Sequence, residues 1–220
     1  VNGNLLLAHL FGAEVHLVES PTEKEKLIKQ LKSEGQRIYN TSSDGYYLRS
    51  LSYVDGFLEL WEQFQNQSIL PDAIYVCSGV HTHVGLVVGS SVLGIPLRIV
   101  GISPSPRQNA GANTQLAEVA NHVVRMLGID LTFSATDFES YGEYAGEAYG
   151  LVTPACREAV ILAARTEGLL LDPVYTGKTF GALIDHIRKG QFARNQTVVF
   201  VHTGGTPALF AYGNEILVDV

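Results

Sequence analysis

Three short segments carry the residues whose types and spacing could do chemistry. They are residues 78–83 (SGVHTH), 173–178 (PVYTGK) and 202–205 (HTGG). Each combines glycine or proline turn chemistry with hydroxyl, amine or imidazole groups able to form hydrogen bonds. Each also follows an apolar run typical of a buried strand, and the carboxyl ends of parallel strands meet at one sheet edge, where α/β proteins bind ligands. We therefore expect the three segments to converge. For 202–205 the alternative is an ordinary turn whose glycines only permit tight packing.

The segment 78–83 has the features of an anion site. It lies between an expected strand at 73–77 and an expected helix, so unpaired backbone N–H groups and two hydroxyls would face a phosphate. It matches neither the P-loop nor the GxGxxG pattern. His81 and His83 stand two residues apart with no carboxylate or cysteine at a useful spacing, so we predict no metal site.

The composition excludes several classes of protein. The 220 residues are 46% hydrophobic and 17% charged, which is typical of an ordered globular chain. A net charge of −7 without a basic cluster argues against a nucleic-acid partner. Cys77 and Cys156 match no metal or redox spacing, which indicates reduced thiols in a cytoplasmic protein. No apolar run approaches the roughly 18 residues of a membrane span and no signal peptide is visible, so we predict no membrane partner. The only methionine is Met126, from which we expect the chain to be a fragment or a processed product.

Strands and helices are expected to alternate along the chain. Apolar periodicity and turn residues predict helices at 5–10, 22–33, 48–65, 84–93, 113–127, 153–167 and 178–188. Strands are expected at 14–18, 37–39, 73–77, 97–102, 132–134 and 197–201, the last fully buried. A further helix should begin with Thr206 as its N-cap and Pro207 in its first position. This alternation indicates an α/β fold with a mainly parallel sheet and helices on both faces.

Two long runs carry a family resemblance. Residues 164–185 (ARTEGLLLDPVYTGKTFGALID) and 200–212 (FVHTGGTPALFAY) resemble D-cysteine desulfhydrases and 1-aminocyclopropane-1-carboxylate deaminases, which are tryptophan-synthase-β-like, pyridoxal-phosphate-dependent enzymes. Segments 3–18, 52–56, 76–89 and 149–154 extend the resemblance along the whole chain. It implies a fold type II enzyme, with residues 1–45 the remainder of an incomplete small α/β domain and 46–220 the large cofactor-binding domain. It also implies a possible homodimer.

The resemblance implies a role for each segment. The cofactor phosphate would be held by the turn before the helix, at Ser78, Gly79, Val80, His81 and Thr82. Thr203, with Gly204 beside it, would reach the pyridine nitrogen, and Thr176 would lie close to the same ring. The deaminases carry glutamate where Thr176 stands, which favours the desulfhydrase branch. Tyr175 would lie beside a small amino-acid substrate as an acid, a base or an orienting group. The implied reaction converts D-cysteine to pyruvate, hydrogen sulfide and ammonia.

Two departures from the family pattern leave other functions open. The Schiff-base lysine of the family lies upstream of the segment that matches Gly3, so we expect this chain alone to be inactive, with Lys178 structural. The phosphate loop is one residue shorter than in relatives and has Val80 and His81 in place of a glycine pair. A non-catalytic homologue that binds a small molecule or a partner is therefore the alternative, and a nucleotide-binding α/β module is a third interpretation.

Overall fold

The computed structural model describes residues 1–41, 43, 45–106 and 109–218. The chain divides into two compact units, Val1–Tyr46 and Tyr47–Val220. The expected boundary after residue 45 falls next to this division. That the two units are the remainder of a small domain and a large cofactor-binding domain stays a prediction.

The first unit contains two helices. Helix α1 (Gly3–Leu10) begins after Asn2, whose side-chain oxygen accepts a hydrogen bond from the Gly3 amide, and α2 (Pro21–Ser33) is capped in the same way by Ser20. The strands predicted at 14–18 and 37–39 are wrong, because both segments are irregular. A strand needs a partner for its ladder, and the described residues of this unit offer none.

The second unit is built on a parallel sheet. Its strands are β1 (Ala73–Cys77), β2 (Arg98–Ile102), β3 (Glu139–Tyr141) and β4 (Val198–Phe200), in the spatial order β3-β2-β1-β4. All three pairings are parallel, as predicted. The strand expected at 132–134 is wrong, since the segment that pairs with β2 is β3. The strand β4 is only half-buried, because β1 alone pairs with it among the described strands.

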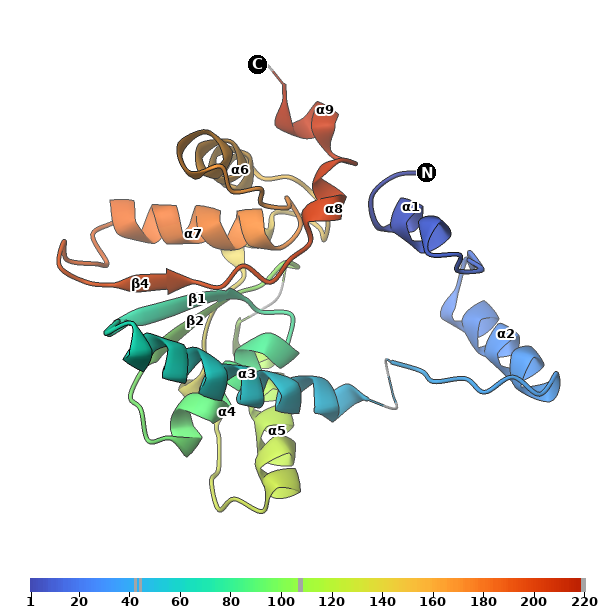
Figure 1. Ribbon diagram of the computed structural model, residues 1–220, viewed down its shortest axis with the longest axis horizontal. Helices are drawn as coiled ribbons and strands as arrows, with labels where there is room; N and C mark the ends of the chain where they lie inside the picture. The colour runs from blue at the N-terminus through green and yellow to red at the C-terminus, as the bar shows by residue number, and fades with distance from the viewer. Residues whose placement is uncertain (42, 44, 107–108, 219–220) are drawn as a thin grey trace. The chain divides into compact units, whose positions relative to one another are not determined.

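Helices cover both faces of this sheet (Figure 1). On one face lie α4 (His81–Val92) and α5 (Asn109–Leu127), and α3 (Tyr46–Asn66) packs against α4. On the other face α7 (Thr176–Arg188) packs on β1 and β2, and α6 (Pro154–Glu167) packs against α7. The predicted long helices are thus confirmed.

Short helical segments complete the unit: η1 (Ala135–Asp137), η2 (Glu143–Ala145), α8 (Thr206–Leu209) and α9 (Gly213–Ile216). The predicted cap of α8 is wrong by one residue. Gly205, in the left-handed conformation at φ +89°, precedes the helix, and Thr206 is already its first residue. Pro207 stands in the first turn, as expected.

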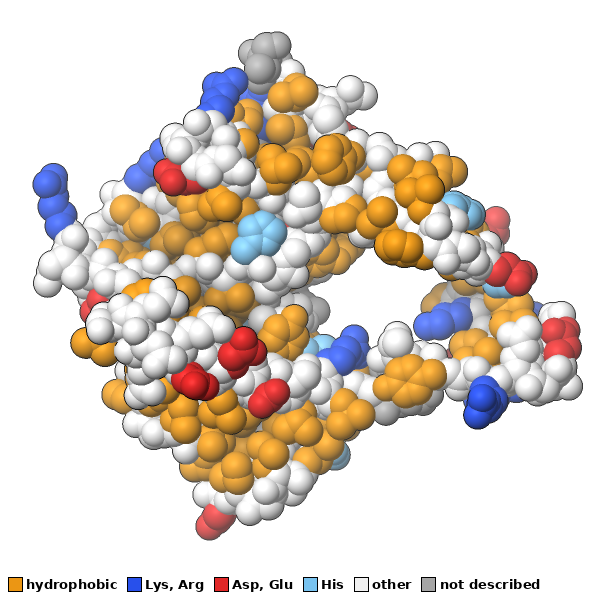
Figure 2. Space-filling model, viewed as in Figure 1, with side chains coloured by type: hydrophobic (Ala, Val, Ile, Leu, Met, Phe, Trp, Pro, Cys, Tyr) orange, Lys and Arg blue, Asp and Glu red, His pale blue; other side chains and the backbone are white. Residues whose placement is uncertain are grey.

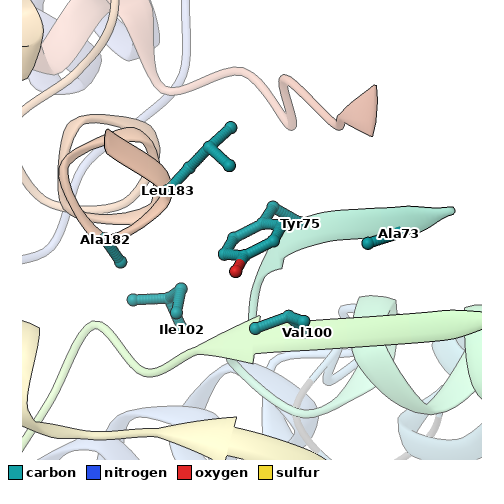
Figure 3. Close-up of a cluster of buried hydrophobic side chains, with 6 residues drawn as sticks. All are labelled: Ala73, Tyr75, Val100, Ile102, Ala182 and Leu183. Carbon is teal, nitrogen blue, oxygen red and sulfur yellow. The ribbon is translucent and has the colours of Figure 1, made fainter. Parts of the chain in front are cut away.

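The core between the sheet and α7 fixes the carboxyl ends of the central strands. Ala73 and Tyr75 of β1, Val100 and Ile102 of β2, and Ala182 and Leu183 of α7 form one buried cluster (Figure 3). The one polar atom of this cluster's side chains, the Tyr75 hydroxyl, lies 2.6 Å from His186 Nδ1. Its hydrogen-bonding capacity is therefore satisfied within the core, and burial raises the pKa of Tyr75 to about 12.

Glycines let α3 and α4 approach closely. A Cβ atom on Gly85 would lie 2.7 Å from the Ser50 carbonyl oxygen, and one on Gly89 would lie 2.7 Å from the Phe57 Cβ. Both glycines stand on one face of α4, four residues apart. The contact therefore sets how α3 lies along the first turn of α4, at the edge where the candidate site is.

The first turn of α7 is closed by a buried carboxylate. Asp172 Oδ2 accepts hydrogen bonds from the amides of Val174 and Tyr175, at 2.8 and 2.9 Å, and its Oδ1 accepts from the amide and the hydroxyl of Thr176. Asp172 and Thr176 are both fully buried. The Gly177 amide donates to the Asp172 carbonyl oxygen at 2.7 Å, so the amides of residues 174–177 are all satisfied within the chain.

Apolar side chains remain at the surface of this unit (Figure 2). Among them are Leu162, Phe210 and Leu217, which lie on α6, between α8 and α9, and after α9. Among the described residues no helix has the length and apolar character needed to cross a bilayer.

We expect Gly101→Ala to destabilise the second unit. A Cβ there would overlap the buried His83 ring and lie 2.8 Å from the Ser78 Cβ, and neither neighbour is a flexible chain end. The free energy of unfolding should fall by about 1–3 kcal/mol, as for other overpacked cores. The control is Gly56→Ala in α3, where nothing lies within 4 Å of the added atom and stability should rise by up to about 1 kcal/mol. Urea denaturation measures both, and equal effects would contradict this packing.

We also expect Asp172→Asn to weaken the start of α7. The amide keeps the shape but removes the charge, and its NH₂ group cannot accept hydrogen bonds from the helix amides. Unfolding free energy should fall by about 1–3 kcal/mol. Asp55→Asn, on the exposed side of α3, should change it by less than about 0.5 kcal/mol. Denaturant titration would refute the role of Asp172 if the two variants were equally stable.

Candidate functional site

The predicted segment 202–205 contacts the residues that come just before the predicted segment 173–178. The Nε2 atom of His202 is 3.0 Å from the Leu170 carbonyl oxygen, and a Cβ on Gly205 would lie 2.7 Å from Asp172 Oδ1. The turn after β4 therefore packs directly on the turn before α7.

Strand pairing brings the third segment to the same edge. Tyr75 of β1 pairs with Phe200 of β4, so Ser78 and Thr203 each stand three residues beyond a paired position. Ser78 also donates its amide hydrogen to the Ile102 carbonyl, at 2.8 Å, which extends the contact of β1 with β2. The carboxyl ends of β1 and β4 thus carry the segments 78–83 and 202–205, as predicted. The expectation is wrong for 173–178, because no described strand lies between α6 and α7, and this segment instead follows the residues that contact the turn after β4.

The start of α4 differs from that of α7. No side chain caps it, and within the described part of the chain the amides of Gly79, Val80 and Thr82 have no acceptor. Gly79 is exposed, and nothing lies within 4 Å of the place where a Cβ would stand. Orphan amides at the first turn of a helix, together with the helix dipole, favour an anion. The start of α4 therefore offers three amide donors, whereas the amides of residues 174–177 at the start of α7 are already paired.

The two histidines of this segment point to opposite sides of α4. Residues two apart on a helix are separated by about 200°. His81 faces α3, where its Nδ1 lies 2.7 Å from the hydroxyl oxygen of the buried Ser50. His83 faces the sheet, where its Nδ1 lies 3.0 Å from the Ser78 hydroxyl oxygen. The pair is therefore split between two serines and cannot chelate one ion in this arrangement.

Both imidazoles are held in the neutral form. Burial lowers the pKa of His83 to about 4, and its ring is fully enclosed, edge-on to Phe138. Burial, with a smaller contribution from the Arg49 charge, also lowers the pKa of His81 to about 4, although this side chain is only half-buried. His83 is thus part of the core, while His81 remains at the edge of the site.

The hydroxyls of two predicted cofactor ligands are engaged elsewhere. Thr176 donates to Asp172 Oδ1 at 2.7 Å, and its oxygen accepts from the Asp172 amide at 2.9 Å. Its predicted contact with the cofactor ring is therefore not supported by this geometry, because a fully buried hydroxyl has both functions satisfied within its turn. Ser78 is only 5% exposed, and its hydroxyl is hydrogen-bonded to His83. A ligand at the start of α4 would therefore meet the main chain of this residue and not its hydroxyl.

Tyr175 has a partner that the sequence analysis did not identify. Its hydroxyl forms a short hydrogen bond with that of Tyr149, which lies in the tyrosine- and glycine-rich loop before α6. Burial, reinforced by this hydrogen bond, raises the pKa of Tyr175 above its usual range. The phenol is therefore protonated at neutral pH. The high tyrosine content of this loop was the only sequence feature that could have indicated such a partner. No spacing rule predicts a contact between Tyr149 and Tyr175, which are 26 residues apart.

Thr203 and Gly204 form the solvent-facing part of the turn after β4. Thr203 is exposed, and Gly204 adopts a positive φ of +98° and donates its amide hydrogen to His202 Nδ1 at 3.2 Å. This conformation favours glycine. The structure thus fixes the main chain of the turn and leaves the Thr203 side chain at the surface.

Lys178 is structural, as predicted. Its ammonium group donates to the carbonyls of Ala145 and Pro104, at 2.7 and 3.2 Å, and the side chain is only 1% exposed. Burial lowers its pKa. The amine therefore holds the loops after β2 and around η2 against α7.

The sequence analysis did not identify Asp172 and Ser50, which hold the start of α7 and the His81 ring in place. Asp172 stands four residues before the helix it closes and precedes a proline, a pattern that could have indicated a cap. Ser50 had no sequence signal, because only the packing of α3 on α4 brings it to His81.

Known proteins resemble this chain along most of its length. The family model described as pyridoxal-phosphate dependent enzyme matches residues 1–204. The 1-aminocyclopropane-1-carboxylate deaminase of Methylobacterium nodulans is 32% identical over 220 residues, covering 96% of this chain and 65% of the deaminase.

Solved structures give the same result. A crystal structure of an ACC deaminase homologue matches 98% of this chain and 66% of its own chain, with a TM-score of 0.84 and 29% identity. O-ureido-L-serine synthase matches with a TM-score of 0.63 at 14% identity, which shows a common fold alone. The chain therefore spans about two thirds of the length of the deaminase and of the solved homologue.

These matches confirm the predicted tryptophan-synthase-β-like α/β fold, and they confirm pyridoxal phosphate as the cofactor of the family. Strand order, helix placement and the match over residues 1–204 agree: this chain belongs to the family of pyridoxal-phosphate-dependent enzymes.

Proposed function

We propose that this chain is the greater part of a pyridoxal-phosphate-dependent lyase or deaminase that acts on a small amino acid. The reaction we favour is that of a D-cysteine desulfhydrase, in which D-cysteine and water give pyruvate, hydrogen sulfide and ammonia. The observation that carries this proposal is the uncapped start of α4 beside the turns that hold Tyr175 and Thr203.

The chemistry of the donor set supports a phosphorylated ligand. The amides of Gly79, Val80 and Thr82 would hold the phosphate group at the start of α4, where the helix dipole favours a negative charge. Thr203 would reach the ring nitrogen from the neighbouring turn. A neutral hydroxyl there does not protonate the ring, in contrast to a carboxylate. When bound, the cofactor supplies electron delocalisation at the α-carbon of the substrate.

Tyr175 and Tyr149 would serve the substrate as a pair. Since the pKa of Tyr175 lies above its usual range, this phenol holds its proton at neutral pH and would act as a donor or an orienting group rather than as a base. Its hydrogen bond to Tyr149 fixes which way the hydroxyl points.

A non-catalytic homologue is the second candidate, and one observation favours it. Val80 and His81 stand at the start of α4, where the family resemblance implies a glycine pair. Such a protein would keep the binding edge without the turnover. A homodimer and a cytoplasmic location stay predictions.

The activity is tested on the product of the complete gene, supplied with pyridoxal phosphate. We expect cofactor absorbance that survives gel filtration and is bleached by borohydride, together with sulfide and pyruvate from D-cysteine. Ammonia and 2-oxobutyrate from 1-aminocyclopropane-1-carboxylate would assign the deaminase reaction instead. Bound cofactor without turnover of either compound would favour the non-catalytic homologue, and absence of bound cofactor would refute the proposal.

Tyr149→Phe tests the tyrosine pair on this chain. Removing the partner hydroxyl should lower the pKa of Tyr175, while burial keeps it above the ordinary value. Tyrosine labelled with ¹³C at Cζ reports the titration by NMR, with the Tyr175 signal assigned from Tyr175→Phe. Tyr39→Phe, in the first unit, is the control and should leave that signal unchanged. A Tyr175 pKa unaffected by Tyr149→Phe would mean that the two phenols do not interact.

A further inference from the structure

We propose that His202 is a positioning residue of the site, whose neutral imidazole holds the turn after β4 so that Thr203 is presented to the pyridine ring of the cofactor. This inference rests on the proposed function, in which Thr203 reaches the ring nitrogen. It adds to that function the residue that fixes the turn.

The main chain alone does not fix the turn after β4. Among the residues that the structure describes, no main-chain group of 202–204 forms a hydrogen bond with another main-chain group. Gly204 and Gly205 both adopt a positive φ, at +98° and +89°. Such glycines have more conformational freedom to lose on folding than any other residue. The position of Thr203 therefore depends on side-chain contacts of its neighbours.

The imidazole of His202 supplies hydrogen bonds that the main chain lacks. Gly204 donates its amide hydrogen to Nδ1 at 3.2 Å, and Nε2 lies 3.0 Å from the Leu170 carbonyl oxygen. The ring also lies edge-on to that of Phe200 in β4, with the ring centroids 6.3 Å apart and an interplanar angle of 75°. One side chain thus connects the turn to β4 and to the segment before α7.

The two hydrogen-bond partners determine where the imidazole carries its hydrogen. An amide N–H group can only donate, and a carbonyl oxygen can only accept. Nδ1 must therefore present its lone pair to Gly204, and Nε2 must carry the hydrogen that is donated to Leu170. The opposite tautomer and the doubly protonated ring would each place a second hydrogen in front of the Gly204 amide. The geometry thus selects one neutral tautomer of His202.

These contacts hold Thr203 from both sides. The side chain of His202 and the amide of Gly204 close a short hydrogen-bonded loop around it. On the other side, a Cβ on Gly205 would lie 2.7 Å from Asp172 Oδ1, so this residue is packed against the start of α7. The Thr203 side chain itself stays exposed. A group held in place before the ligand arrives costs less entropy on binding, which is how His202 would contribute to affinity.

Two probes that differ only at the ring nitrogen test this role. They are pyridoxamine 5′-phosphate and its 1-deaza analogue, in which a CH group replaces that nitrogen, and neither can condense with a lysine. Dissociation constants are measured by calorimetry at fixed pH for the product of the complete gene, freed of cofactor. His202→Ala should weaken binding of pyridoxamine 5′-phosphate about tenfold, which corresponds to about 1.4 kcal/mol, and binding of the analogue less than about twofold.

Further variants separate positioning from packing. His202→Asn should recover part of the lost affinity, because an asparagine side chain can accept a hydrogen bond from the amide two residues on. Thr203→Val should show the same selective loss as His202→Ala, and the double variant should bind no more weakly than Thr203→Val alone. Gln63→Ala, which removes an exposed hydrogen bond to Glu59 in α3, is the control and should bind both probes as the parent does.

NMR spectroscopy reads the tautomer of His202 directly. In long-range ¹H–¹⁵N correlation spectra of the neutral ring, Nδ1 should have the shift of an unprotonated nitrogen and Nε2 that of a protonated one. The opposite tautomer, or an averaged pair of signals, would overturn the inference, because the bond from Gly204 would then not be formed.

The binding results distinguish this inference from the function on which it rests. If the parent prefers pyridoxamine 5′-phosphate to the analogue but His202→Ala weakens both probes equally, or neither, the inference is overturned and the proposed function stands. If the parent binds both probes alike, Thr203 does not reach the ring nitrogen, and the role of His202 fails while the phosphate site stands. If the parent binds neither probe, the proposed function fails as well.

Discussion

The strand β1 pairs in parallel with β2 on one side and with β4 on the other, so the segments that follow these strands leave the sheet at a single edge. The positions of these strand ends are fixed by packing, because Tyr75, Val100 and Ile102 are fully buried against α7. The turn after β4 is held in turn by His202 and Gly205 against the segment before α7. The candidate site therefore depends on parallel pairing, which brings segments distant in the sequence to one edge of the sheet.

Two helices begin at this edge and differ in what they offer. Asp172 satisfies the first amides of α7, and this buried carboxylate also limits the space beside Gly205. The start of α4 has no side-chain cap of this kind. A helix N-terminus already satisfied by a buried carboxylate has little to offer a second negative charge, so the start of α4 is the more favourable of the two for an anion.

Close packing of α3 on α4 sets the surroundings of His81. Gly85 permits the contact that brings Ser50 to the start of α4, and Ser50 in turn orients His81. On the opposite side of the same helix, Gly101 leaves room for the ring of His83. The two histidines thus have different surroundings although only one residue lies between them, since the helical repeat turns their side chains about 200° apart.

The sequence by itself determined the architecture and the family. Apolar runs, caps and glycine stops located β1 and α6 almost to the residue, and the motifs around Tyr175 and Thr203 identified the relatives. Only the tertiary structure decided that the strand beside β2 is β3 and not residues 132–134. It alone also decided the hydrogen-bond partners of Thr176, Tyr175 and His81. Local periodicity reports which face of an element is apolar. It contains no information on which distant hydroxyl or carboxylate will satisfy a buried polar group, because that choice is made only when the elements pack.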